Sequence, residues 1–131
     1  MVERSEYRKL LEERRSWYKT IKKVYCPCLK ADVVFNSRGF RHVQFDGDGK
    51  ERSTGDKVKR LNLLPHSVVI IREAEIIDDH RSYSGVEFWA FKREIAGLGQ
   101  KVIVVLKRAG NGNIAYVSVM TEEQKRQKDR Q

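Results

Sequence analysis

The segment 100–120 constrains the fold of this chain more than any other, because two β-branched runs there flank Asn111-Gly112. An Asn-Gly dipeptide between such runs strongly indicates a tight β-hairpin. With this dipeptide at the turn, alternate side chains of the two strands are expected to form an apolar face. The expected apolar pairs are Leu106 with Val117 and Val104 with Val119.

The opposite face of this hairpin is expected to be polar. Lys107 falls opposite Tyr116, and Ser118 is diagonal to Lys107. A cation, a phenol and a hydroxyl on one sheet face can hold a phosphate group. The same pattern also fits a half-solvated sheet whose outer face carries ordinary polar residues. A binding face and a plain solvated face are therefore both compatible with the pattern.

The charge balance favours a polyanionic partner. The 131 residues include 27 lysines and arginines against 18 acidic residues, which gives a formal net charge of +9. Such an excess is typical of proteins that bind RNA, DNA or an acidic protein, although a soluble protein with an uneven surface is the alternative. A chain of this length is expected to form one domain with its own core.

Other classes of site and compartment are not favoured. The chain has no apolar run of membrane-spanning length and no signal-peptide core near its N-terminus, so a cytoplasmic location and no membrane contact are expected. Cys26 and Cys28 are too few for a disulfide framework. The three histidines have no metal-ligand spacing, so neither a metal site nor a cofactor is expected.

Hydrophobic periodicity predicts helices first and antiparallel strands after them. Ser53 or Thr54 can cap a helix that Pro65 ends, and the segment 36–42 reads as a turn. The segment 66–74 fits either a strand or a short helix. Helices are expected over 3–23 and 53–64, and strands over 31–36, 86–93 and the hairpin 100–120.

This order predicts an α+β fold in which N-terminal helices pack on one face of a curved antiparallel sheet of about four strands. Residues 1–23 are expected to form the covering helix, and residues 24–120 the α+β domain. The segment 121–131 lacks apolar anchors and is expected to be a disordered charged tail.

Several residues have the chemistry needed to cut RNA without a metal. Such cleavage needs a base, an acid and fixed cations beside the phosphate. His42, which is expected to be displayed after a glycine turn, is the natural proton carrier, and Tyr116 and Ser118 can donate hydrogen bonds. The candidate phosphate-binding cations are Arg38, Arg41, Arg52, Arg72, Lys107 and Arg108.

A run of short motifs resembles the barnase–EndoU–colicin–RelE-like nuclease domains of phages, a group of small metal-independent endoribonucleases and toxins. The likeness covers roughly residues 24–120, and it implies one or two helices followed by a four-stranded antiparallel sheet, with 66–73 helical. The motifs are Phe35–His42, Arg52, Arg60–Pro65, Phe88-Trp89, Val104–Arg108 and Tyr116–Ser118.

The resemblance implies that His42, Arg52, Lys107 (or Arg108) and Ser118 are site residues. Many related domains have a second catalytic histidine, and the sequence leaves open whether His66 or His80 takes that role. Without either histidine, Lys107 or Tyr116 would have to serve as the acid, or the chain would bind RNA without cutting it.

The leading hypothesis is a metal-independent endoribonuclease, a toxin or mobile-element effector, that cuts RNA through attack by the 2′-hydroxyl. Its expected partners are RNA and an inhibitor protein. In this hypothesis His42 is the general base, Arg52 and Lys107 stabilise charge on the phosphorane, Ser118 binds the phosphate, and Tyr116 orients or stacks a base.

One alternative is a non-catalytic RNA- or DNA-binding module. Another is an interaction protein that docks a partner through Trp17 and Tyr18.

Overall fold

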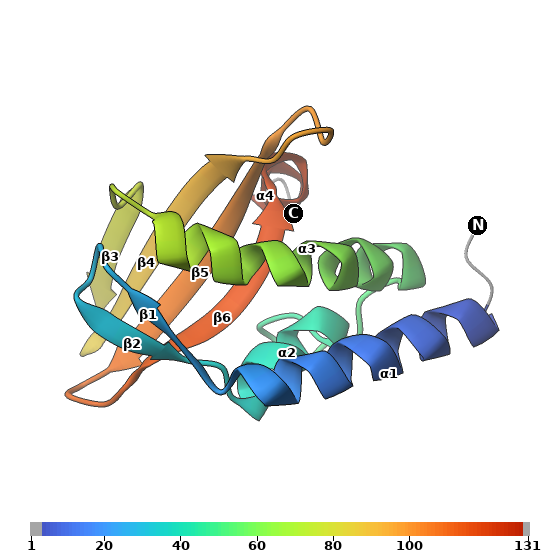
Figure 1. The fold of residues 1–131 in the computed structure, drawn as a ribbon, viewed down its shortest axis with the longest axis horizontal. Helices are drawn as coiled ribbons and strands as arrows, with labels where there is room; N and C mark the ends of the chain where they lie inside the picture. Colours follow the sequence, from blue (N-terminus) through green and yellow to red (C-terminus); the bar gives the residue numbers. More distant parts are fainter. Residues whose placement is uncertain (1–3, 130–131) are drawn as a thin grey trace.

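The computed structural model describes residues 4–129 and has an α+β architecture, as the sequence predicted (Figure 1). One sheet contains all six strands, in the order β1-β2-β6-β5-β4-β3. The helices are α1 (Arg4–Ile21), α2 (Ser37–Gln44), α3 (Thr54–Glu73) and α4 (Glu122–Asp129). The strands are β1 (Lys23–Cys26), β2 (Ala31–Val34), β3 (Asp79–Tyr83), β4 (Val86–Glu94), β5 (Lys101–Ala109) and β6 (Ile114–Thr121).

The sheet is larger than the predicted set of about four antiparallel strands, and it is mixed. β2 runs parallel to β6, and β1 and β3 form the two edges of an open sheet. Sequence reasoning missed β1 because it is only four residues long, and it missed β3 because most of its residues are polar and exposed. Short, polar edge strands of this kind limit unwanted pairing with other chains, and they also hide the periodicity that would reveal them.

The β5–β6 hairpin forms as predicted, but its register changes halfway along. Val104 pairs with Val119, as expected, but Val105 pairs with Ser118 and Leu106 with Tyr116, so Val117 of β6 is left unpaired in a β-bulge. A bulge adds one unpaired residue to a strand and so reverses which face the following side chains occupy. The prediction of Lys107 opposite Tyr116 is therefore wrong, since Lys107 pairs with Ala115.

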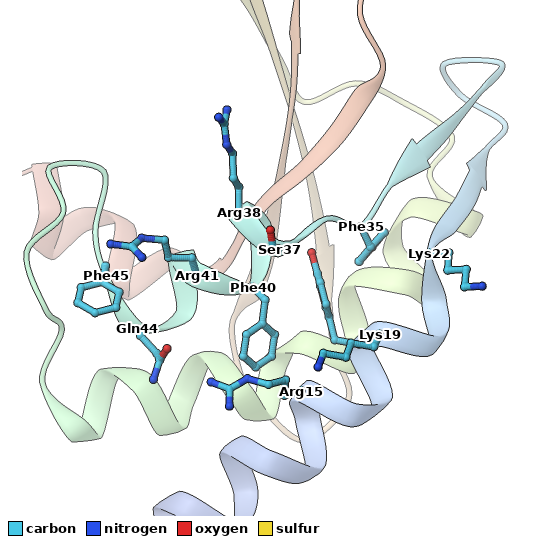
Figure 2. A pocket seen from close by; sticks show the side chains of 11 residues that line it. Arg15, Lys19, Lys22, Phe35, Ser37, Arg38, Phe40, Arg41, Gln44 and Phe45 are labelled. Carbon is cyan, nitrogen blue, oxygen red and sulfur yellow. The ribbon is translucent and has the colours of Figure 1, made fainter.

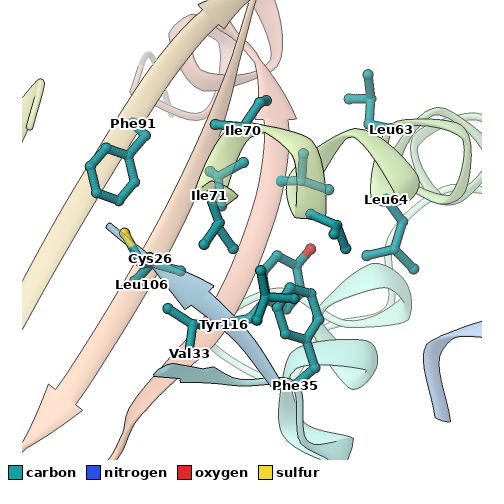
Figure 3. Close-up of a cluster of buried hydrophobic side chains, with 14 of the residues drawn as sticks. Cys26, Val33, Phe35, Leu63, Leu64, Ile70, Ile71, Phe91, Leu106 and Tyr116 are labelled. Carbon is teal, nitrogen blue, oxygen red and sulfur yellow. The ribbon is translucent and has the colours of Figure 1, made fainter. Parts of the chain in front are cut away.

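α3 crosses one face of the sheet, called the inner face below, and the hydrophobic core lies between them (Figures 1 and 3). Alternation along β5 directs Val104 and Leu106 toward α3, while Val105 and Lys107 belong to the opposite, outer face. The core residues at the centre of this layer include Val33, Leu64, Ile71, Phe91, Leu106 and Tyr116.

α3 continues through Pro65, where the sequence predicted that it would end. A proline inside a helix lacks the N–H that would bond to the carbonyl four residues earlier, here that of Leu61. In this protein the Nε of Arg14, on α1, donates to the Leu61 oxygen at 3.0 Å. A side chain from another helix therefore replaces the missing bond, and the helical reading of 66–73 implied by the resemblance is confirmed.

α2 occupies the segment that the sequence analysis took for a turn. Asn36 caps this helix, because its side-chain oxygen accepts from the N–H of Gly39 at 3.2 Å. Gly39 faces β6 so closely that an added Cβ would lie 2.7 Å from the carbonyl oxygen of Tyr116. Only glycine permits this approach. It lets α2, which follows β2 in the chain, pack beside β6.

The predicted disordered tail is instead largely helical over its described part, residues 121–129. Thr121 ends β6, and α4 follows it directly. Gln124 is buried, and its amide nitrogen donates to Asp56 of α3 at 2.6 Å. A polar contact rather than an apolar anchor therefore attaches this segment. Among residues 4–129, no helix combines the length and apolar character needed to cross a lipid bilayer.

The Arg14–Leu61 contact makes a testable prediction about how Pro65 is tolerated. We expect Arg14→Ala to lower the free energy of unfolding by about 1–3 kcal/mol, because it leaves the Leu61 carbonyl without a partner. In a Pro65→Ala background the new N–H can bond to Leu61 itself, so the same Arg14→Ala change should cost about 1 kcal/mol less. Urea unfolding of the four proteins gives the coupling energy, and strict additivity would contradict this account.

Candidate nucleic-acid interface

A groove of about 510 Å³ lies between α1 and α2 (Figure 2). Its floor is aromatic, with contributions from Tyr18, Phe35, Phe40 and Phe45. The five basic residues that line it, called the groove cations below, are Arg15, Lys19, Lys22, Arg38 and Arg41. None of its lining residues is acidic. A concave surface with positive charge of this density attracts polyanions.

The cations of the first wall share one side of α1. Arg15 and Lys19 are four residues apart, which places them in successive turns on the same helix surface, and Lys22 follows the last helical residue. They lie at the C-terminal end of α1, where the helix dipole favours positive charge. Lys22, just beyond the helix, adopts a φ of 59°, and this left-handed turn directs the chain into β1.

The second wall is α2, and aromatic rings order one arginine on each wall. The guanidinium carbon of Arg41 lies 4.6 Å from the ring centre of Phe45. Across the groove, the guanidinium carbon of Arg15 lies 5.5 Å from the ring centre of Phe40, and Figure 2 shows Phe40 pointing from α2 toward α1. Cation–π contacts of this kind hold a guanidinium group in place while leaving its charge available to a ligand.

Two hydrogen bonds fix the walls relative to one another. The Tyr18 hydroxyl of α1 donates to the carbonyl oxygen of Asn36, the cap of α2, at 2.6 Å. The N–H of Phe35 donates to the carbonyl oxygen of Lys22 at 2.8 Å. Burial raises the pKa of Tyr18 well above its ordinary value, so the phenol stays protonated and continues to donate. The groove is therefore preformed.

The groove cations differ from several arginines elsewhere in the protein. Within residues 4–129, none of these five side chains forms an ion pair with a carboxylate. By contrast, Arg60 pairs with Asp56, Arg93 with Glu73, and Arg108 with Glu87. Cations that are not neutralised by the protein's own acids remain available for an external anion.

The predicted catalytic histidine lies next to this groove rather than in a displayed turn. His42 is half-buried within α2. It follows Arg38 by four residues, so the two share one side of the helix. α2 also packs against β6, the strand that carries Ser118. The structure thus places His42 and Arg38 together on the helix that borders β6.

Arg52 has a structural role, in contrast to its predicted contact with phosphate. Its Nε donates to the carbonyl oxygen of His42 at 2.8 Å, and its Nη1 lies 3.4 Å from the carboxylate of Asp56. Asp56 also accepts from Arg60, whose Nη1 donates to the carbonyl oxygen of Val119 on β6. Burial, together with the nearby Arg60, lowers the pKa of Arg52 from its ordinary value. Arg52 therefore connects α2 to α3 instead of facing solvent.

Tyr116 cannot contact a substrate as predicted. The bulge in β6 turns it to the inner face, where it is 2% exposed and stacks on Phe35 with ring centres 4.8 Å apart. Burial raises its pKa far above the ordinary value. The other two members of the predicted polar face, Lys107 and Ser118, do lie on the same outer face, since Ser118 pairs with Val105.

The remaining predicted cations lie elsewhere in the fold. Arg72 is exposed in the last turn of α3. Arg108 lies on the inner face near the β3 edge, with its Nη2 2.5 Å from Glu87 and its guanidinium carbon 5.6 Å from the ring centre of Trp89. His80 also bonds to Glu87, at 3.0 Å, and stacks on Trp89. Neither arginine lines the groove.

Sequence reasoning therefore identified two groove cations, Arg38 and Arg41, and missed Arg15 and Lys19 on α1 and Lys22 just after it. Their regular spacing near the end of a predicted helix was the available indication, but an exposed charged helix face has the same pattern. The aromatic residues of the floor did not reveal the groove in the sequence, because aromatic residues of a hydrophobic core occur at the same spacing along the chain.

The Asp56 contacts predict unequal effects of two similar substitutions. Asp56→Asn should lower the free energy of unfolding by about 2–3 kcal/mol, because it leaves Arg60 and Arg52 without their carboxylate. This is less than the roughly 3–5 kcal/mol of a fully buried pair, since the Asp56 side chain is 27% exposed. The matched change Asp32→Asn removes a solvent-exposed pair with Lys23 and should cost about 0.5 kcal/mol or less. Equal unfolding midpoints in urea would contradict this ranking.

Comparisons with protein-family models, with curated proteins and with solved structures gave no match. The resemblance to the phage nuclease domains therefore stays a prediction. Within the part of the chain that the structure describes, no group of three or more histidine, cysteine, aspartate or glutamate side chains is arranged to hold a metal ion. The arrangement that remains is a preformed, cationic, aromatic-floored groove with a histidine beside it.

Proposed function

We propose that this protein is a nucleic-acid-binding module whose binding surface is the groove between α1 and α2, and that RNA is its ligand. One observation carries the proposal: five cations without carboxylate partners, within residues 4–129, surround one concave surface. Contacts between basic side chains and phosphates supply most of the affinity of such proteins. The net charge of +9 acts in the same direction over longer distances.

The arrangement of paired and unpaired cations supports this reading over a surface that is merely basic. Arg52 and Arg60 are held by Asp56 inside the fold, and Arg108 is held by Glu87 at the far edge. The unpaired cations of the groove come from two elements that are distant in the sequence. Their convergence on one side of the molecule is what a phosphate backbone requires.

A second candidate function, RNA cleavage, is favoured by the position of His42. Arg38 can bind a phosphate, and His42 lies on the same side of α2, next to β6. In this scheme the imidazole takes the proton of a 2′-hydroxyl, the oxygen attacks the adjacent phosphorus as the bond to the 5′-oxygen breaks, and the leaving 5′-oxygen takes a proton from solvent water. The products are a 2′,3′-cyclic phosphate and a 5′-hydroxyl. Arg52 would position His42 through its hydrogen bond to the His42 carbonyl oxygen. We include in this second proposal that the chain has the barnase- and RelE-like nuclease fold.

The binding proposal predicts a salt-dependent loss of affinity on neutralising one cation. Because Lys19 lines the groove, Lys19→Gln should weaken RNA binding and make the slope of log affinity against log salt shallower by about 0.7–1. Lys92→Gln, an exposed lysine on β4, is the matched control and should leave the slope unchanged. Fluorescence anisotropy between 50 and roughly 300 mM salt measures both. Identical slopes for the two variants would exclude the groove as the binding surface.

The cleavage proposal predicts that binding and cutting separate at one residue. With labelled RNA in EDTA, His42→Ala should abolish product formation while changing affinity by about twofold or less, because proton transfer and phosphate contacts are distinct contributions. His80→Ala, on the distant β3 edge, should cut normally. Absence of cleavage by the wild-type protein, or loss of cleavage only in His80→Ala, would overturn the role of His42 and leave the binding proposal standing.

A further inference from the structure

We infer that the groove selects single-stranded nucleic acid, with an unpaired base stacking on the guanidinium groups above its aromatic floor and the flanking phosphates on its cationic rim. This inference rests on the proposed nucleic-acid-binding function. It specifies that the bound nucleic acid is single-stranded and names the side chains that discriminate against a duplex.

The groove combines two kinds of surface that a phosphate backbone alone would not use. Its rim is cationic, and its floor is built from aromatic rings. The outside of a double helix presents phosphates and sugars, so an aromatic floor would gain nothing from it. A single strand presents charged phosphates and flat, weakly polar base faces together, and proteins bind it with basic grooves that contain stacking surfaces.

A base that enters the groove can stack mainly on the guanidinium groups of arginines, because the aromatic rings are largely covered. Phe40 is only 7% exposed, and Tyr18 is only 3% exposed, because both pack into the core. Arg15 lies against the ring of Phe40, and Arg41 lies against the ring of Phe45. Unstacked RNA bases bind to arginine planes as well as to aromatic rings. Each arginine is already ordered by its ring, so little freedom is lost when a base stacks on it.

The position of these two arginines restricts what can enter. Arg15 belongs to α1 and Arg41 to α2, so they line the groove from opposite walls. The space between the helices, about 510 Å³, has the size of a pocket for a small organic ligand. It can take an extruded base with its sugar, whereas paired bases stay stacked inside their duplex and cannot reach it.

An anisotropy experiment with the full chain tests the inference. The probes are a labelled single-stranded RNA octamer, the blunt duplex of the same sequence, a single nucleotide, and inorganic polyphosphate as a charged chain without bases. We expect the wild-type protein to bind the single strand about tenfold more tightly than the duplex or the nucleotide. Binding of duplex and single strand with equal affinity would overturn the inference while leaving the proposed function intact.

A charge-preserving substitution separates stacking from electrostatic attraction. Arg41→Lys keeps the positive charge and removes the planar group, so we expect affinity for the single strand to fall about fivefold or more. Its affinity for polyphosphate should change by less than about twofold. Arg93→Lys, which changes an exposed arginine on β4, is the matched control and should match the wild-type protein with every probe. Arg15→Lys repeats the test from the opposite wall if Arg41→Lys is unstable by circular dichroism.

The remaining outcomes are also decisive. An equal loss of single-strand and polyphosphate affinity in Arg41→Lys would assign Arg41 a purely structural or electrostatic role and overturn the stacking mechanism. Equal affinity for the nucleotide and the octamer would make a free nucleotide the ligand. No binding to any nucleic acid, combined with binding to vesicles that contain anionic lipid, would overturn the proposed function itself.

Discussion

The hydrogen bond from the Arg14 side chain to the Leu61 carbonyl is the contact on which the arrangement of the helices depends. α3 must cross the inner face of the sheet to cover its apolar residues, and Pro65 interrupts its own hydrogen bonding midway. The oxygen that this leaves without a partner accepts from α1 at 3.0 Å. The same contact that preserves α3 therefore positions α1, and α1 supplies one wall of the groove.

The arginines that pair with Asp56 stabilise the fold, whereas the groove cations, which have no acidic partner within residues 4–129, are available for binding. Asp56 gathers Arg52, Arg60 and Gln124, and so joins the regions around α2, α3 and α4. A carboxylate near buried guanidinium groups is required there, because an unpaired buried charge is costly. The groove cations face solvent and need no such partner. Part of the positive excess in the composition therefore lies in a groove that a polyanion can reach.

The sequence predicted the elements with strong local patterns and failed where one contact changed the pattern. The hairpin around Asn111-Gly112, the first helix and the strand beginning at Val86 all form as expected. A single bulge near Val105 moves Tyr116 from the predicted polar face into the core. Nothing in the alternation of β6 marks this bulge, since valine and tyrosine suit either face of a strand.

Some features of the candidate site could likewise be predicted from local sequence patterns, and others could not. The amino-acid sequence by itself determined the α+β class, the positive charge and the amphipathic first helix, because these follow from composition and periodicity along short stretches. Only the tertiary structure decided that Arg52 is internal and that Arg15 and Lys19 line the same groove as Arg41. Such pairings depend on contacts between residues far apart in the chain, and local propensities contain no information about which distant partner a side chain meets.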